Sequence, residues 1–237
     1  MRFLYNAPAI LHNKALIIGD THFGMEDRLR QEGIFDEEFS ERIFIRIKEL
    51  LAETRAEKLI ILGDVKERIP ALDPRTADIL AKLSLLCELI IVRGNHDGGI
   101  EGCAAKIVPS DGFVHGRLGL VHGHGWPSKE CMAAEYLVSA HQHPQLSLVD
   151  RSGRRHGEPV WMLATPDAKN IAAHYKEFNK KIRLVLMPAF NPLVGASFTA
   201  AGARMGPLLS NNLFKMDAAS VYRLDGTLLG ELKNIKG

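Results

Sequence analysis

The sequence lacks a long apolar run, a linker, a low-complexity tract and an internal repeat. A membrane-spanning helix needs roughly 18 or more consecutive apolar residues, and the first eight residues, MRFLYNAP, do not form the apolar core of a signal peptide. Because nothing marks a boundary, we expect residues 1–237 to form one domain. The cysteines are few and show no metal-like spacing, so Cys87, Cys103 and Cys131 are expected to be free thiols in a reducing compartment, the cytoplasm.

Net charge is also small, at +2, so the overall charge does not call for a nucleic-acid partner. The distribution is uneven, because residues 151–183 contain eight Lys or Arg and only three acidic residues. Two interpretations of this stretch stay open. It is either a solvated surface with lysine-rich turns or a rim that attracts phosphate groups.

Short aliphatic runs predict buried strands at residues 15–18, 59–62, 89–92, 118–121 and 136–138. Between the first two runs, apolar residues recur every three or four positions over residues 35–51, which predicts a helix. Between the second and third, Asp73 followed by Pro74 predicts the start of another helix. Alternating strands and helices favour an α/β sheet with right-handed crossovers.

After about residue 110 the predicted strands become shorter and turns more frequent. Turns are expected at residues 117–119, 151–153 and 224–227, and a short helix is expected after Thr165 and Pro166. The second half of the chain is therefore predicted to form a more antiparallel sheet that packs against the first.

Every predicted strand is followed by side chains that can bind metal. In chain order they are Asp20 and His22, Asp64, Asn95 with His96 and Asp97, His122 with His124, and His141 with His143. The carboxyl ends of strands are where open α/β sheets place their ligand sites. Glycines next to these residues permit tight turns and close approach of the backbone to a bound group.

Each of these motifs has an ordinary explanation when taken alone. An Asp-x-His pair is common in surface turns, an aspartate after a strand commonly caps the next helix, and a His-x-His pair can lie in a core. Their joint occurrence, in order and always at strand ends, indicates a metal site instead. Oxygen and imidazole ligands without thiolate suit Mn²⁺, Fe or Zn²⁺ and do not choose between them.

The series Asp20-x-His22, Gly63-Asp64, Gly94-Asn95-His96-Asp97, His122 and His141-x-His143 resembles the calcineurin-like metallophosphoesterase superfamily. Lys66, Pro144 and residues 187–192 (MPAFNP) further resemble a subgroup found beside DNA ligase or helicase genes and described as DNA-damage-response endonucleases. One departure is Ala140, where the superfamily usually has glycine; alanine is tolerated there if its φ is negative. The resemblance implies an α/β fold of two facing mixed β-sheets flanked by helices, a four-layer α/β/β/α arrangement.

The resemblance also implies a division of the metal ligands. One metal would take Asp20, His22 and His143, the other would take Asn95, His122 and His141, and Asp64 would bridge them. The implied cofactors are two divalent ions, Mn²⁺ first, with Fe, Zn²⁺, Ni²⁺ and Mg²⁺ as alternatives. A water activated between two such ions attacks phosphorus in line.

Four further residues near the predicted ligands receive expected roles. His96 would protonate the leaving oxygen, and Asp97 would hold the His96 ring. His124 either touches substrate or lines the metal pocket. Lys66 either reaches a substrate phosphate or is a surface lysine at the start of a loop.

The expected function is a metal-dependent phosphodiesterase or nuclease that acts on DNA or another nucleic acid. The alternative is a phosphoesterase for small molecules such as cyclic nucleotides, and a remote alternative is a non-catalytic scaffold of the same fold. Partnership with a DNA ligase or helicase is implied by the resemblance alone, no membrane partner is expected, and a monomer and a dimer both stay open.

Overall fold

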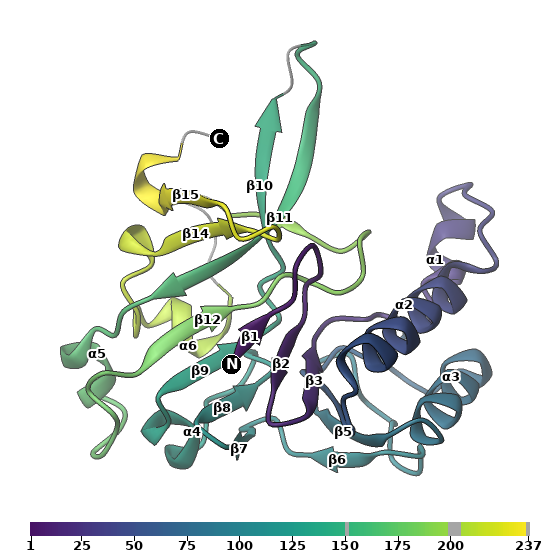
Figure 1. The fold of residues 1–237 in the computed structure, drawn as a ribbon, viewed down its shortest axis with the longest axis horizontal. Helices are drawn as coiled ribbons and strands as arrows, with labels where there is room; N and C mark the ends of the chain where they lie inside the picture. Colours follow the sequence, from purple (N-terminus) through teal and green to yellow (C-terminus); the bar gives the residue numbers. More distant parts are fainter. Residues whose placement is uncertain (150–151, 199–204, 236–237) are drawn as a thin grey trace.

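The computed structural model describes residues 1–149, 152–198 and 205–235, which form two mixed β-sheets with helices on their outer sides (Figure 1). The first sheet has the strand order β1-β2-β3-β4-β5-β6. Its strands are β1 (Arg2–Phe3), β2 (Ile10–His12), β3 (Ala15–Ile18), β4 (Lys58–Ile61), β5 (Glu88–Val92) and β6 (Lys106–Val108). Strands β3 to β6 run parallel, so their carboxyl ends lie at the same edge.

Helices α1 (Glu26–Gln31), α2 (Phe39–Thr54) and α3 (Pro74–Ser84) lie on the outer face of this sheet. The predicted cap is present, because the Asp73 carboxylate accepts a hydrogen bond from the Thr76 backbone N–H at 2.9 Å. The apolar stripe of α2 packs on β3 and β4 through residues such as Ile47, in one cluster with Leu16 and Leu59. Burying such a side chain contributes about 1.5–3 kcal/mol, so each crossover helix is held by its apolar face.

The second sheet follows the order β13-β10-β11-β12-β9-β8-β7, and β14 pairs with both β11 and β15. Its strands are β7 (Phe113–His115), β8 (Leu118–Val121), β9 (Tyr136–Ser139), β10 (Pro144–Val149), β11 (Arg155–Ala164), β12 (Arg183–Leu186), β13 (Ala196–Ser197), β14 (Ser220–Arg223) and β15 (Leu228–Glu231). Helices α4 (Lys129–Ala133), α5 (Ala168–Ala172) and α6 (Gly206–Ser210) cover its outer face, and two 3-10 turns, η1 (Met216–Ala218) and η2 (Leu232–Asn234), adjoin β14 and β15.

The two sheets are joined by a shared apolar layer. Alternate residues of each strand point into it, so Ile17 and Ile60 of the first sheet meet Leu120, Val138 and Val185 of the second. The neighbouring residues of the same strands point outward to the helices. The predicted α/β arrangement of two facing sheets flanked by helices is confirmed.

Several local predictions need correction. Strands β8, β9 and β12 run parallel, so the second sheet is less antiparallel than expected. Its short helix α5 is capped by Asp167 rather than by the preceding Thr165 and Pro166. Residues 118 and 119 belong to β8, which puts the turn earlier in the chain. The predicted turn at 224–227 joins β14 to β15, and position 151 of the other turn lies outside the described residues.

Within the described ranges, no helix is both long enough and apolar enough to cross a membrane.

Candidate metal centre

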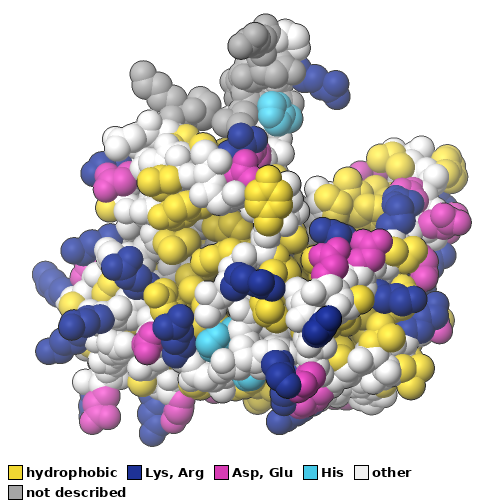
Figure 2. Space-filling model, viewed as in Figure 1, with side chains coloured by type: hydrophobic (Ala, Val, Ile, Leu, Met, Phe, Trp, Pro, Cys, Tyr) yellow, Lys and Arg dark blue, Asp and Glu magenta, His cyan; other side chains and the backbone are white. Residues whose placement is uncertain are grey.

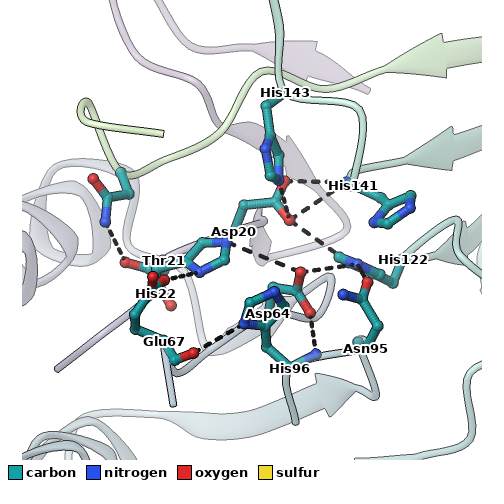
Figure 3. A network of polar contacts seen from close by, with 12 residues as sticks. Asp20, Thr21, His22, Asp64, Glu67, Asn95, His96, His122, His141 and His143 are labelled. Atoms are coloured by element: carbon teal, nitrogen blue, oxygen red, sulfur yellow. Dashed lines mark hydrogen bonds and ion pairs between the residues drawn. The ribbon is translucent and has the colours of Figure 1, made fainter. Parts of the chain in front are cut away.

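The side chains predicted to bind metal come together where the carboxyl ends of five strands meet (Figure 3). Three of these strands, β3, β4 and β5, belong to the first sheet, and β8 and β9 belong to the second. The residues that follow them are Asp20, His22, Asp64, Asn95, His122, His141 and His143. Residues far apart in the chain are therefore in direct contact, as between Asp20 and His143, whose Oδ1 and Nε2 lie 3.2 Å apart.

The backbone at this edge is unusual, because five of the seven residues have a positive φ. Left-handed conformations cost a non-glycine residue about 1–3 kcal/mol each and persist only where the surroundings enforce them. The five are Asp20 (φ 55°), His22 (44°), Asp64 (47°), His141 (67°) and His143 (44°). Ala140 is not among the positive-φ residues, so its methyl group is accommodated as the sequence required. Such a concentration of strain is typical of a functional site.

Glycines allow the strand ends to approach one another. A Cβ added to Gly63, whose φ is +74°, would lie 2.6 Å from the His122 ring. A Cβ added to Gly94 would lie 2.3 Å from the Asp64 backbone nitrogen and carboxylate. Neither position has room for a larger residue, so glycine is required for the assembly of the site.

Asp64 lies at the centre of the cluster. Its Oδ2 is 3.3 Å from His122 Nε2 and 3.9 Å from His22 Nε2, and its Oδ1 accepts a hydrogen bond from the His96 backbone N–H at 2.8 Å. Burial alone would raise the pKa of Asp64, but the hydrogen bond and charge of His122 and the His96 N–H hold it well below its usual range. Asp64 is therefore an ionised carboxylate shared by histidines on both sides.

Asp20 joins the remaining histidines from the opposite side. Its Oδ1 lies 3.2 Å from His143 Nε2 and 3.6 Å from His122 Nδ1. The backbone N–H of His141 donates a hydrogen bond to Asp20 Oδ2 at 3.2 Å. Because Asp20 is fully buried, these contacts position it without access of bulk water.

The surroundings of His122 call for a cation. Its Nδ1 lies 2.7 Å from the Leu62 carbonyl oxygen, so Nδ1 must carry a proton and donate it. Its Nε2 then faces two acceptors, Asn95 Oδ1 at 3.1 Å and Asp64 Oδ2. Burial alone would lower the pKa of His122, but Asp64 and Asp20 raise it to about 9. The pKa of the neighbouring His141 is lowered to about 4 by burial and by the charge of His122. A proton or a metal ion must lie between these acceptors and Nε2.

Buried ring nitrogens without a hydrogen-bond partner test the fit to metal further. Among the described residues, His22 Nε2 and His143 Nε2 are such atoms. Leaving them unpaired in the interior costs free energy, which a bound cation would recover. Two groups of possible ligand atoms, each within 4.8 Å of one another, share Asp64: Asp20, His22, Asp64 and His143, and Asp64, His122 and His141. This donor set fits two adjacent divalent ions.

His96 lies beside this cluster and not in it. Its ring centroid is 5.1 Å from that of His22, and its Nδ1 lies 2.9 Å from the Glu67 carbonyl oxygen. Because a carbonyl only accepts, Nδ1 carries a proton and Nε2 is left for another partner. The ring is half-buried, so it is accessible from the open side of the site.

The role expected for Asp97 is wrong, because the carboxylate is used elsewhere. Its Oδ1 accepts a hydrogen bond from the Val65 backbone N–H at 2.9 Å, and its Oδ2 accepts one from Gly94 N–H at 2.8 Å. Asp97 thus ties together the two loops that carry Asp64 and Asn95. The carbonyl of Glu67 holds the His96 ring instead.

Glu67 is a residue that sequence reasoning missed. Its Oε2 lies 2.8 Å from His22 Nδ1, and its Oε1 accepts a hydrogen bond from Arg28 at 3.2 Å. The carboxylate therefore keeps the proton of His22 on Nδ1 and leaves Nε2 facing Asp64. The only signal in the sequence is the position of Glu67, three residues after Asp64, and this spacing does not predict contact with a histidine 45 residues away.

Neither interpretation of Lys66 holds, because its side chain is fully buried. Its ammonium donates hydrogen bonds to the carbonyls of Arg68, Ile69 at 2.8 Å and His96 at 2.7 Å. An ammonium has three donors, so these contacts saturate it and leave none for a substrate phosphate. Lys66 instead fixes the backbone that carries His96.

Both interpretations of His124 stay open. Its ring centroid lies 5.2 Å from that of His122 and 6.1 Å from that of His141. Its Nδ1 is buried and has no hydrogen-bond partner among the described residues. Burial and the charge of His122 lower the pKa of His124, which favours a neutral ring in either role.

Residues 187–192 contact the backbone of the loop that carries Asp20. The backbone N–H of Phe190 donates to the Gly19 carbonyl at 2.9 Å, and that of Asn191 donates to the Asp20 carbonyl at 3.2 Å. The buried amide of Asn191 donates to the Thr21 carbonyl at 3.1 Å. This segment therefore supports the loop that carries Asp20.

Known proteins resemble this chain in family and in fold. A family model described as calcineurin-like phosphoesterase matches residues 14–179. Among solved structures, nuclease MPE from Pseudomonas putida has a TM-score of 0.54 at 23% identity, covering 90% of this chain and 85% of that chain, and shares its fold. Yfce, a phosphoesterase from E. coli, has a TM-score of 0.43 at 17% identity, covering 92% of this chain and 97% of that chain. No curated protein matches the chain.

Proposed function

The chain belongs to the calcineurin-like phosphoesterase family, and from this premise we propose that it is a metal-dependent phosphodiesterase that cuts nucleic acid. The observation that carries the proposal is the pair of ligand groups sharing Asp64, with buried ring nitrogens that have no hydrogen-bond partner among the described residues. A scaffold without metal would pay the cost of these unpaired polar groups and gain nothing from them. We also propose that residues 1–237 form one domain, because the apolar layer between the sheets draws on both halves of the chain.

The ligands divide between the two ions as follows. Asp20, His22 and His143 would hold one ion, and Asp64 would be shared. The other ion would be held by His122 and His141 with the amide oxygen of Asn95. Mn²⁺ is the first candidate, and Fe, Zn²⁺, Ni²⁺ and Mg²⁺ are alternatives, because oxygen and imidazole donors suit them all to different degrees.

When bound, two divalent ions supply an acidified water and stabilise charge on the phosphoryl oxygens. The chain contributes the rest. His96, whose Nδ1 is held by the Glu67 carbonyl, presents Nε2 to protonate the leaving oxygen. Lys66 keeps the loop of His96 in place, because its ammonium donates a hydrogen bond to the His96 carbonyl.

The exposure of one side of the site supports the proposal that the substrate is a polymer. Asn95 is exposed, and His96, His124 and His141 are half-buried, so the reaction centre faces solvent along one side. A site for a small metabolite commonly encloses most of its ligand. That a nuclease shares this fold makes nucleic acid the first substrate to test.

The deciding experiment is an activity panel in Mn²⁺ with and without chelator. It compares bis-p-nitrophenyl phosphate, cyclic and ordinary mononucleotides, single-stranded DNA and nicked DNA, with Asp64→Asn as the inactive control. We expect metal-dependent cleavage of the diester and of DNA. Activity confined to mononucleotides would support the small-molecule alternative, and failure to bind Mn²⁺ at all would support the scaffold.

A further inference from the structure

The loop that leaves the metal centre after His124 carries an exposed tryptophan. Trp126 is 43% exposed, whereas the second tryptophan, Trp161, is 3% exposed and lies in the core between the sheets. Trp126 is two residues beyond His124, so its Cα lies within about 7 Å of that residue. A large aromatic surface is therefore held in solvent close to the reaction centre.

This indole is fixed in place rather than mobile on a flexible loop. The ring of His174 packs on it with centroids 4.5 Å apart and planes tilted by 36°. The ring of Tyr175 lies 6.2 Å away, and its hydroxyl donates a hydrogen bond to the Pro127 carbonyl at 2.7 Å. Because these contacts tie two segments of the chain together, the orientation of Trp126 is set before any ligand binds.

The segments that adjoin Trp126 and His174 carry exposed basic side chains. The segment after Tyr175 runs along α4, because Asn179 N–H donates to the Met132 carbonyl at 3.0 Å and Arg183 N–H donates to the Glu135 carbonyl at 3.0 Å. The exposed cations of this segment and of the flanking helices α4 and α5 are Lys129, Lys169, Lys176, Lys180, Lys181 and Arg183. In Figure 2, Lys and Arg side chains gather along the left edge of the molecule, where Figure 1 shows α5.

These cations are less often paired with carboxylates than the arginines near Glu67 are. Within the described part of the chain, only Lys129 among the six lies within 4.0 Å of a carboxylate, that of Glu130 at 3.9 Å. The arginines near Glu67 are paired with acids instead, as Arg28 is with Glu32 at 3.2 Å. The stretch that is unevenly basic in the sequence thus contributes positive charge without a carboxylate partner within 4.0 Å on the segment that includes His174 and Tyr175.

We propose that Trp126, backed by His174, is a stacking platform for a base of single-stranded nucleic acid, and that the surrounding lysines hold its phosphates. Aromatic rings beside basic side chains bind single strands because each base offers a face and each nucleotide a phosphate. A duplex hides its base faces in the stack, so the platform selects an unpaired strand. The inference rests on the proposed function, and it assigns the strand a path from the metal centre across the loop 122–128.

The platform is tested by fluorescence. In an Asp64→Asn, Trp161→Phe background, Trp126 is the only tryptophan, and oligo(dT) and oligo(U) are titrated while emission is recorded. We expect saturable quenching by either strand, and the difference between the two titrations reports whether DNA or RNA is preferred. Trp126→Ala has no tryptophan left in this background, so its binding is measured by the fluorescence anisotropy of dye-labelled oligo(dT). It should bind about 5- to 150-fold more weakly, since one base stacked on an aromatic ring contributes about 1–3 kcal/mol. Trp126→Phe should retain most of the affinity.

Two controls match these variants. Tyr5→Ala removes an aromatic ring that is more exposed than Trp126 but lies before β2. For charge, Lys180→Ala with Lys181→Ala should reduce the slope of log affinity against log salt by about 1.4, since each single-strand phosphate contact contributes about 0.7. Lys14→Ala with Lys58→Ala, which removes two lysines that are paired with acids, should change that slope much less.

The outcomes separate this inference from the proposed function. If bis-p-nitrophenyl phosphate and single-stranded DNA are hydrolysed but Trp126→Ala binds oligo(dT) like the parent, the platform is refuted and the activity stands. If no phosphodiester is hydrolysed but Trp126 is quenched as expected, the platform stands and the activity is refuted. Equal quenching by poly-glutamate would also overturn the platform, because it would indicate a general response to polyanions.

Discussion

Removing the carboxylate of Glu67 should weaken metal binding without touching any predicted ligand. In the structure this carboxylate lies 2.8 Å from His22 Nδ1 and 3.2 Å from an Arg28 nitrogen. Glu67→Ala leaves His22 free to rotate or to move its proton to Nε2, the atom that faces Asp64. Outer partners of metal-binding histidines typically contribute 10- to 100-fold in affinity or activity, so a loss on the order of 30-fold is expected. Glu67→Gln should lose less, because an amide oxygen still accepts from Nδ1.

The assay is Mn²⁺ activation of bis-p-nitrophenyl phosphate hydrolysis, with the half-activating Mn²⁺ concentration and the turnover at saturation measured separately. Glu32→Gln is the matched control, because Glu32 is the other carboxylate on Arg28 and does not contact His22. We expect the half-activating concentration to rise for Glu67→Ala and to stay unchanged for Glu32→Gln. Wild-type Mn²⁺ dependence together with wild-type turnover in Glu67→Ala would refute the positioning role.

Four further outcomes follow from the geometry. His96→Ala should keep both metals, measured by elemental analysis, yet lose about 10²–10⁴-fold in turnover on an unactivated phosphodiester; unchanged turnover would remove His96 as the acid. Gly63→Ala should abolish Mn²⁺ binding, seen by calorimetry, because its Cβ would lie 2.6 Å from the His122 ring, and normal binding would contradict the packing requirement. Lys66→Met should lower the free energy of unfolding by about 2–4 kcal/mol, because three backbone carbonyls lose the donor that the buried ammonium supplies. An unchanged denaturant midpoint would refute this. In the presence of chelator, protonation of His122 should stabilise the fold, because its folded pKa of about 9 exceeds the unfolded value of 6.5. This stabilisation is complete below pH 6.5 and is lost as the pH rises through 9. Thermal unfolding should show this alkaline loss in the parent but not in His122→Asn.

The sequence by itself determined the framework and the ligand types. Aliphatic runs of three or four residues predict buried strands, and the helical stripe at 35–51 and the cap at Asp73 predict crossover helices between them. Because strands joined by such crossovers run parallel, their carboxyl ends lie at one edge of the sheet. The side chains after these strands were therefore expected to lie close together, and the resemblance to a known family selected the seven candidate ligands among them.

Only the tertiary structure decided how the supporting residues are used. Asp97 and Lys66 are adjacent in sequence to site residues, yet both bind backbone groups, because buried loop amides and carbonyls need partners and these side chains were nearest. Glu67 reaches His22 across 45 residues, and the pairing of Trp126 with His174 spans 48. Such contacts depend on the packing of one loop on another, and no local pattern in the chain encodes them. The candidate ligands can thus be read from the sequence, whereas the contacts that orient them and the surface beside them are set by the fold.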